Sequence, residues 1–178
     1  MTALGPNDRR GHSGRALVES VVRTRASRLG ADGSLLVARI VLAWIFIYYG
    51  AGKLFGAFNG PGLHKSALYF SNSAHLHPGG LFALAGGVIE LAGGLGLAVG
   101  LGTRLFGAAL CADMVMAMIT VTWATGINSK TSPPGYQLNL ALGALALAVA
   151  VFGSGRFSLD ALVEHRITTR DSATVAHT

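Results

Sequence analysis

Four long runs of apolar residues, separated by shorter polar segments, dominate the hydropathy pattern of the chain. They cover about Leu35–Phe58, Leu81–Leu101, Leu105–Gly126 and Tyr136–Gly153. A helix needs roughly 20 consecutive, mainly apolar residues to cross the hydrocarbon core of a bilayer. The pattern therefore predicts an all-α, polytopic membrane protein. We expect its membrane domain, residues 35–160, to be an antiparallel bundle of four transmembrane helices.

The segments between the apolar runs set the expected connections. The second and third runs are joined only by "GLGTR", so these helices must be antiparallel neighbours. The link "INSKTSPPGYQ" is typical of a loop that ends one helix and precedes the next. The first link is longer and half apolar, and its stretch "LHKSALYF" predicts a short helix on the outer face.

Composition supports lipid as the solvent. Of the 178 residues, 51% are hydrophobic and only 12% are charged, whereas soluble domains carry about a quarter charged residues. The first apolar run follows a long basic tail and lacks a small-residue cleavage site close behind it. A cleaved secretory signal is therefore not expected.

The net charge of +6 is distributed asymmetrically. Short loops rich in Lys and Arg stay in the cytoplasm. Residues 1–34 and 161–178 and the "GLGTR" turn hold most of the arginines, whereas the opposite loops offer Lys65 and Lys130. We therefore expect a plasma-membrane protein with both termini cytoplasmic, and nucleic-acid binding is not expected.

The two tails are predicted to differ in structure. Within residues 1–34, "RALVESVVRTRASRL" places apolar residues near one helical face with arginines around the rest. Such a stretch can lie in the inner membrane interface, and a disordered basic tail is the alternative. Residues 161–178 are expected to be flexible.

Glu90 is the one acidic residue within the second apolar run. Four glycines surround it at three- and four-residue spacing, Gly86, Gly87, Gly93 and Gly94, while bulky aliphatic residues occupy the opposite face. Small residues allow close helix packing in a membrane. We therefore expect these glycines to form a packing seam and Glu90 to point into the bundle.

Three further charges lie within the predicted spans. Asp113 is near the middle of the third run. Arg39 and Lys53 lie fourteen residues apart on about the same face of the first, Arg39 near its cytoplasmic end and Lys53 towards its outer end. Each such charge costs at least about 2.5–3.5 kcal/mol at a helix centre unless it is paired or hydrated. Two acids and two bases are thus predicted to converge, either as a structural ion-pair cluster or as a ligand or proton pocket.

Other chemistry is constrained by residue types. Cys111 is the only cysteine, which excludes an internal disulfide or a CxxC redox pair, and all six histidines lie outside the predicted spans. Loop histidines such as His75 and His77 are more simply surface residues than metal ligands, so no metal site is expected. Tyr49 and other aromatic residues near the outer helix ends either anchor the protein at the interface or wall a pocket.

The chain resembles the DoxX family of small, four-helix bacterial membrane proteins. The likeness spans about Arg39 to Asp160 and rests on "RIVLAWIFIYYGAGKLF", "FALAGGVIELAGGLGLAVGLGTRL", "CADMVMAMI" and "YQLNLALGALALAVAVFGSGRFSLD". It implies that the following residues matter: Arg39, Gly50, Lys53, Glu90, Gly93, Gly94, Thr103, Arg104, Tyr136, Asn139, Gly155, Arg156, Ser158 and Asp160. Gln137 departs from the acid that relatives carry after the tyrosine.

The resemblance implies a function in membrane redox or sulfur metabolism. Some relatives are subunits of thiosulfate:quinone oxidoreductase, and others are linked to assemblies with a sulfurtransferase and a superoxide dismutase. We expect an accessory or anchoring subunit of the bacterial plasma membrane, which docks a redox or sulfur-handling partner and can form a homo-oligomer. A quinone is the candidate cofactor, and the candidate pocket residues are Arg39, Tyr49, Lys53, Glu90, Asp113 and Asn139.

Two alternatives stay open at this point. The first is a quinone-reducing enzyme subunit in which an acid passes protons while an external donor supplies electrons. The second is a small proton-coupled transporter that uses the same acids as a relay. The residues alone leave undecided whether the protein is an enzyme.

Overall fold

The structure, a computed structural model, describes residues 7–128, 130, 134–153, 155 and 158–160, with side chains from residue 30 onward. Within these residues every regular element is helical, which confirms the all-α class. The α-helices are α1 (Asn7–Phe55), α2 (Gly62–Asn72), α3 (Gly79–Val99), α4 (Thr103–Ala117) and α5 (Gln137–Phe152). The predicted flexible tail, residues 161–178, lies outside the described residues.

The chain divides into two compact units, Met1–Ser34 and Leu35–Thr178. In the described part of the first unit, the backbone from residue 7 to residue 34 is helical. The second unit contains the rest of α1 together with α2 to α5, and it holds every residue of the site discussed below.

Three helical segments among the described residues are long and apolar enough to cross a membrane. They are Gly30–Phe55, Gly79–Val99 and Thr103–Thr125. α5 is equally apolar but has only 16 residues, which at 1.5 Å per residue gives about 24 Å, less than the roughly 30 Å of a hydrocarbon core. Membrane-spanning helices are thus supported, whereas the fourth crossing stays a prediction.

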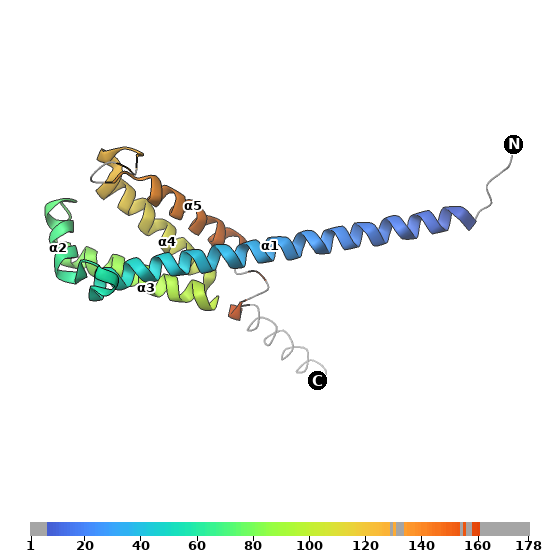
Figure 1. Cartoon of the computed structure of the whole chain (residues 1–178), viewed down its shortest axis with the longest axis horizontal. Helices are drawn as coiled ribbons and strands as arrows, with labels where there is room; N and C mark the ends of the chain where they lie inside the picture. The colour runs from blue at the N-terminus through green and yellow to red at the C-terminus, as the bar shows by residue number, and fades with distance from the viewer. Residues whose placement is uncertain (1–6, 129, 131–133, 154, 156–157, 161–178) are drawn as a thin grey trace, which may run out of the picture. The chain divides into compact units, whose positions relative to one another are not determined.

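Two glycines make the tight turn between α3 and α4. Gly100 and Gly102 adopt left-handed φ angles of 72° and 59°, a conformation that glycine reaches without steric cost. The turn lets α4 pack back on α3, and α5 in turn packs along α4, while α2 packs on α3 (Figure 1). The short helix predicted from "LHKSALYF" is present as α2.

The third predicted span is not α-helical throughout. After Ala117 the chain forms a π-helical turn, Met118–Thr122, and then a 3-10 turn, Trp123–Thr125. The hydroxyl of Thr120 donates a hydrogen bond to the carbonyl oxygen of Met116 at 2.7 Å. Such side-chain bonding, in a run of β-branched residues, competes with regular helix geometry. The predicted span, Leu105–Gly126, is thus present as the continuous helical segment Thr103–Thr125, and its last two turns depart from α-helical geometry.

The core of the second unit is contributed by four of its helices. Its buried residues are Leu42, Ala43 and Phe46 of α1, Leu97 of α3, Leu110 and Met114 of α4, and Leu142, Ala146 and Val149 of α5. By contrast, Leu81, Leu84, Val88, Leu95 and Val99 of α3 are exposed, as the sequence indicated. This exposed face suits contact with lipid.

Helices α1 and α3 approach most closely at glycines. A Cβ atom added at Gly50 would lie 2.6 Å from the backbone nitrogen of Leu91, and one at Gly94 would lie 2.9 Å from the backbone nitrogen of Ile47. Because the atoms that would be met belong to the backbone, they cannot move aside as a flexible side chain can. This contact brings the end of α1 against the middle of α3.

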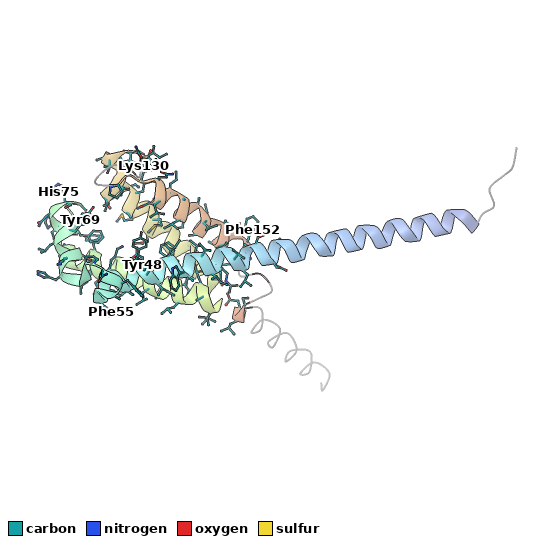
Figure 2. The ribbon with its side chains drawn as sticks, in the orientation of Figure 1. Tyr48, Phe55, Tyr69, His75, Lys130 and Phe152 are labelled. Carbon is teal, nitrogen blue, oxygen red and sulfur yellow. The ribbon has the colours of Figure 1, made fainter. Side chains whose placement is uncertain are left out.

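The loops gather at the two ends of the unit. Figure 2 shows His75 and Lys130 near the end that carries α2, with Phe152 towards the other end. The residues that follow α2 and the loop between α4 and α5 therefore share one end, which is the arrangement expected for antiparallel helices joined by short connections.

Candidate functional site

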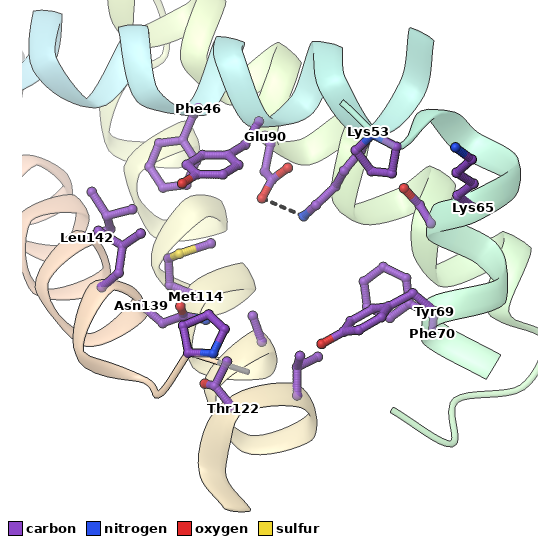
Figure 3. Close-up of a pocket in the computed structure, with 17 residues that line it drawn as sticks. Phe46, Lys53, Lys65, Tyr69, Phe70, Glu90, Met114, Thr122, Asn139 and Leu142 are labelled. Carbon is purple, nitrogen blue, oxygen red and sulfur yellow. Dashed lines mark hydrogen bonds and ion pairs between the residues drawn. The ribbon is translucent and has the colours of Figure 1, made fainter. Parts of the chain in front are cut away.

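A buried ion pair joins α1 to α3. Glu90 is only 3% exposed, and its Oε1 atom lies 2.7 Å from Nζ of Lys53 in the last turn of α1 (Figure 3). Glu90 reaches this position because the glycines around it leave space: Leu54 of α1 covers Gly87, and Leu110 of α4 covers Gly93. These small residues therefore allow α1 and α4 to pack closely around Glu90.

The second oxygen of Glu90, Oε2, is buried and has no hydrogen-bond partner in the part of the chain that the structure describes. Buried polar atoms in folded proteins are usually hydrogen-bonded, and leaving one unpaired costs about 1–3 kcal/mol. This oxygen can therefore accept a hydrogen bond from a ligand or a water molecule, or can carry a proton.

A pocket of about 520 Å³ opens in front of the ion pair. This volume is within the range of small-molecule sites, which are mostly apolar with a few polar groups. The apolar and aromatic side chains that line it come from four helices and include Phe46 and Tyr49 of α1, Tyr69 and Phe70 of α2, Met114 of α4, and Leu138 and Leu142 of α5. Figure 3 shows Asn139 and Leu142 on one side of this space and Tyr69 and Phe70 on the other.

Four of the six residues predicted for the pocket line it. Tyr49, Lys53, Glu90 and Asn139 are all part of its wall. Asn139 also lines a smaller cavity of about 230 Å³ between α4 and α5. The amide thus lies between the two spaces, where it can donate and accept hydrogen bonds.

Asp113 is close to Glu90 but does not line the pocket. It faces Gly86 of α3, where an added Cβ atom would lie 3.6 Å from its Oδ1 atom, and Gly86 is one helical turn from Glu90. Its Oδ2 atom is buried without a hydrogen-bond partner. Asp113 is therefore a second acid placed beside the α3 face that carries Glu90.

Arg39 lies away from the pocket, contrary to the expected convergence of four charges. It is 1% exposed, and its Nε atom donates a hydrogen bond to the carbonyl oxygen of Leu97 at 3.1 Å. Fourteen residues of helix separate Arg39 from Lys53 by about 21 Å along the axis. The two bases share a face of α1 but lie near opposite ends of the membrane domain, as their helical spacing predicts.

Asp160 completes a second polar cluster at the end of the unit where Arg39 lies. Its carboxylate accepts hydrogen bonds from the backbone N–H groups of Gly102 at 2.8 Å and Thr103 at 3.1 Å. Partial burial acts to raise the pKa of Asp160, but the N–H groups of Thr103 and Gly102, with Arg39 nearby, outweigh it and hold this pKa below its usual value. This carboxylate caps α4 from a distant part of the chain.

Sequence reasoning missed the contribution of α2 and of the π-helical turn. Ser66, Tyr69 and Phe70 line the pocket from α2, and Val121 and Thr122 line it from the π-helical turn. The three α2 residues are three and four positions apart, so they share one face of a helix, and that spacing could have been read from "LHKSALYF". π-Helical turns are often found at functional sites, but no sequence pattern indicated this one.

Among the described residues, no three His, Cys, Asp or Glu side chains gather as metal ligands would. The histidines of the first loop, His64, His75 and His77, are all exposed. The features that distinguish the pocket are its aromatic side chains and the Lys53–Glu90 ion pair.

The chain belongs to the DoxX family, whose profile matches residues 34–123. The matched segment contains Arg39, Lys53, Glu90 and Asp113, and it ends before α5. No curated protein and no solved structure matches the chain.

Proposed function

We propose that this DoxX family protein is an integral membrane subunit whose pocket binds a quinone-type molecule for a redox or sulfur-handling partner. The observation that carries the proposal is the Lys53–Glu90 pair, at 2.7 Å, on the wall of a pocket lined mainly by aromatic and aliphatic side chains. Intramembrane ionisable groups generally mark a site or pathway. The ring of a quinone would contact the apolar side chains of the pocket, and its oxygen atoms would lie beside the Lys53–Glu90 pair.

The residues of the pocket fit a quinone head group in size and chemistry. Phe46, Phe70 and Met114 offer apolar contact to a ring, and aromatic and sulfur-containing side chains pack well on such surfaces. The ammonium group of Lys53 has N–H donors beyond the one used by Glu90, so it can donate to a carbonyl oxygen. When bound, a quinone supplies an acceptor for two electrons and two protons.

Within this proposal Glu90 holds or receives a proton beside the ligand. Its free Oε2 atom is the acceptor for that proton, and Lys53 orients the carboxylate through Oε1. Asp113 of α4, which faces Gly86 one turn of α3 from Glu90, provides a second place for a proton. These roles are those of an accessory subunit, since the electrons come from a partner.

The membrane arrangement that goes with this function includes α5 as a fourth crossing. We infer a protein of the bacterial plasma membrane with both termini in the cytoplasm, where the arginine-rich segments of the chain would lie. On this arrangement, Asp160 and the α3–α4 turn face the cytoplasm and α2 lies at the outer surface. A partner that delivers electrons, or a second copy of the chain, would then bind to this membrane domain.

Binding of a short-chain quinone to the purified protein tests the proposal. Decylubiquinone would be titrated into the protein in detergent, and its dissociation constant measured for the natural chain and for Lys53→Met. Loss of a charged hydrogen-bond donor should weaken binding about 10- to 100-fold. Val88→Leu, on the exposed face of α3, should bind as the natural chain does.

Two results would overturn the proposal. One is the lack of saturable decylubiquinone binding by the natural chain. The other is equal affinity in the Lys53→Met and Val88→Leu variants, because the ligand would then be bound away from the ion pair.

A further inference from the structure

Ser66 is a buried hydroxyl residue of the pocket wall that the functions assigned so far do not use. It lies in α2, is 5% exposed, and its Oγ atom has no hydrogen-bond partner. It lines the same pocket as Lys53 and Glu90. An unpaired buried hydroxyl is unfavourable by about 1–3 kcal/mol, so its position calls for a partner that the folded chain does not supply.

The lack of a hydrogen bond from the Ser66 hydroxyl is unusual for a serine within a helix. A serine within a helix commonly donates a hydrogen bond to the carbonyl oxygen four residues earlier. For Ser66 that residue is Gly62, the first residue of α2, and the bond is not formed. The Ser66 hydroxyl therefore has no hydrogen-bond partner among the described residues, and Ser66 is part of the pocket lining.

Ser66 and the ion pair come from different helices that line the pocket. Lys53 and Glu90 belong to α1 and α3, whereas Ser66 belongs to α2, as do Tyr69 and Phe70, which Figure 3 shows across the space from Asn139 and Leu142. The hydrogen-bonding residues of the lining therefore include a charged donor on α1, Lys53, and a neutral one on α2, Ser66, besides Lys65, Thr122 and Asn139.

We propose that Ser66 is a specificity-determining residue that selects a ring with two oxygen atoms, a para-quinone, over a ring with one. One ligand oxygen accepts a hydrogen bond from Lys53, and the second accepts one from the Ser66 hydroxyl. This inference rests on the proposed function and adds the substrate class. A ligand with a single oxygen binds at Lys53, because hydrogen bonds to charged groups are stronger, and leaves Ser66 unpaired.

Two probes share a six-membered ring with four methyl groups and differ in their oxygen atoms. Duroquinone is a quinone with two opposed carbonyl oxygens, which accept hydrogen bonds, and durenol is a phenol with a single hydroxyl, which accepts and donates. Dissociation constants of both would be measured with the purified protein for the natural chain, Ser66→Ala, Ser66→Thr and Ser73→Ala. Ser73 follows the end of α2 and is exposed, so it is the matched control.

We expect Ser66→Ala to weaken duroquinone binding about three- to tenfold, the equivalent of one neutral hydrogen bond, and to leave durenol binding unchanged. Ser66→Thr keeps the hydroxyl and should still prefer duroquinone to durenol, and Ser73→Ala should behave as the natural chain.

An unchanged duroquinone affinity in Ser66→Ala would overturn the assignment of Ser66 while leaving the proposed function standing. An equal loss for both probes would also overturn it, since the effect would then be one of pocket shape. If the natural chain binds neither probe, the proposed function fails together with this inference.

Discussion

The Nζ atom of Lys53 lies 2.7 Å from Oε1 of Glu90, while Oε2 of the same buried carboxylate has no hydrogen-bond partner among the described residues. One oxygen of the acid is thus held by a base from another helix, and the other is buried without a hydrogen bond. A carboxylate held in this way can serve both as a link between α1 and α3 and as a proton-carrying wall of the pocket. The predictions below separate these roles.

The first prediction concerns the energetic coupling of the pair. Lys53→Met should reduce the free energy of unfolding because it leaves Glu90 buried without its base, and Glu90→Gln in the same chain should recover part of that loss. A double-mutant cycle measured in detergent should give a coupling energy of about 0.5–3 kcal/mol. Additive effects of the two substitutions would show that the pair contributes nothing to stability.

The second prediction concerns the close approach of α1 to α3. Gly50→Ala should lower the free energy of unfolding by about 1–3 kcal/mol, because the new methyl group would meet the backbone of Leu91. Gly80→Ala is the matched control, since a Cβ atom there meets nothing within 4 Å. Thermal unfolding in detergent measures both, and equal melting temperatures would contradict the described packing.

The third prediction concerns the pH dependence of the Asp160 cap. The pKa of Asp160 is lowered in the folded protein, so its contribution to stability is present above the unfolded pKa of about 3.9 and is lost as the pH falls towards the folded pKa. The stability advantage of the natural chain over Asp160→Asn should therefore shrink on acidification below about pH 5. If the difference in the free energy of unfolding between the natural chain and Asp160→Asn stays constant down to pH 3, the charge of Asp160 does not contribute to stability.

A companion substitution at the same position tests the cap itself. Asp160→Ala removes both acceptors of the Gly102 and Thr103 N–H groups, and loss of a helix cap typically costs about 1 kcal/mol. Asn keeps one acceptor, so Asp160→Asn should be less destabilised than Asp160→Ala at neutral pH. The reverse order would argue against capping.

Helical periodicity predicted much of this structure, and its failures have physical causes. The glycine spacing around Glu90 correctly placed that residue inside, because a face of small residues is where another helix can come close. The same spacing put Arg39 and Lys53 on one face of the first helix but near opposite ends of it. The structure adds that Arg39 is buried beside Leu97 and does not line the pocket that contains Lys53.

The missing parts of the pocket depended on tertiary contacts. The spacing of Ser66 and Tyr69 places them on one face of a short helix, but the packing of that helix on α3, which brings this face to the pocket, is a tertiary contact. The π-helical turn that brings Val121 and Thr122 to the pocket depends on side-chain to backbone hydrogen bonds. Such local competition is not visible in hydropathy.

The fourth prediction concerns orientation in the membrane. Reporter fusions that are active only in the cytoplasm should give a signal when joined to either end of the chain, and a fusion within the loop that contains Lys130 should give none. This follows from the excess of arginine in the tails and in the α3–α4 turn. An inactive reporter at either terminus would contradict both the orientation and the fourth crossing by α5.

The most direct test of a quinone-binding pocket is to ask what the protein carries from its own membrane. The natural chain, Glu90→Gln and Val88→Leu would be purified with native lipid, extracted, and analysed by mass spectrometry for quinone per protein. Because Glu90→Gln preserves the shape of the side chain but removes its charge and proton, the account predicts quinone in the natural chain and in Val88→Leu, and clearly less in Glu90→Gln. Equal quinone in all three preparations, or none above a membrane protein purified in parallel, would contradict it.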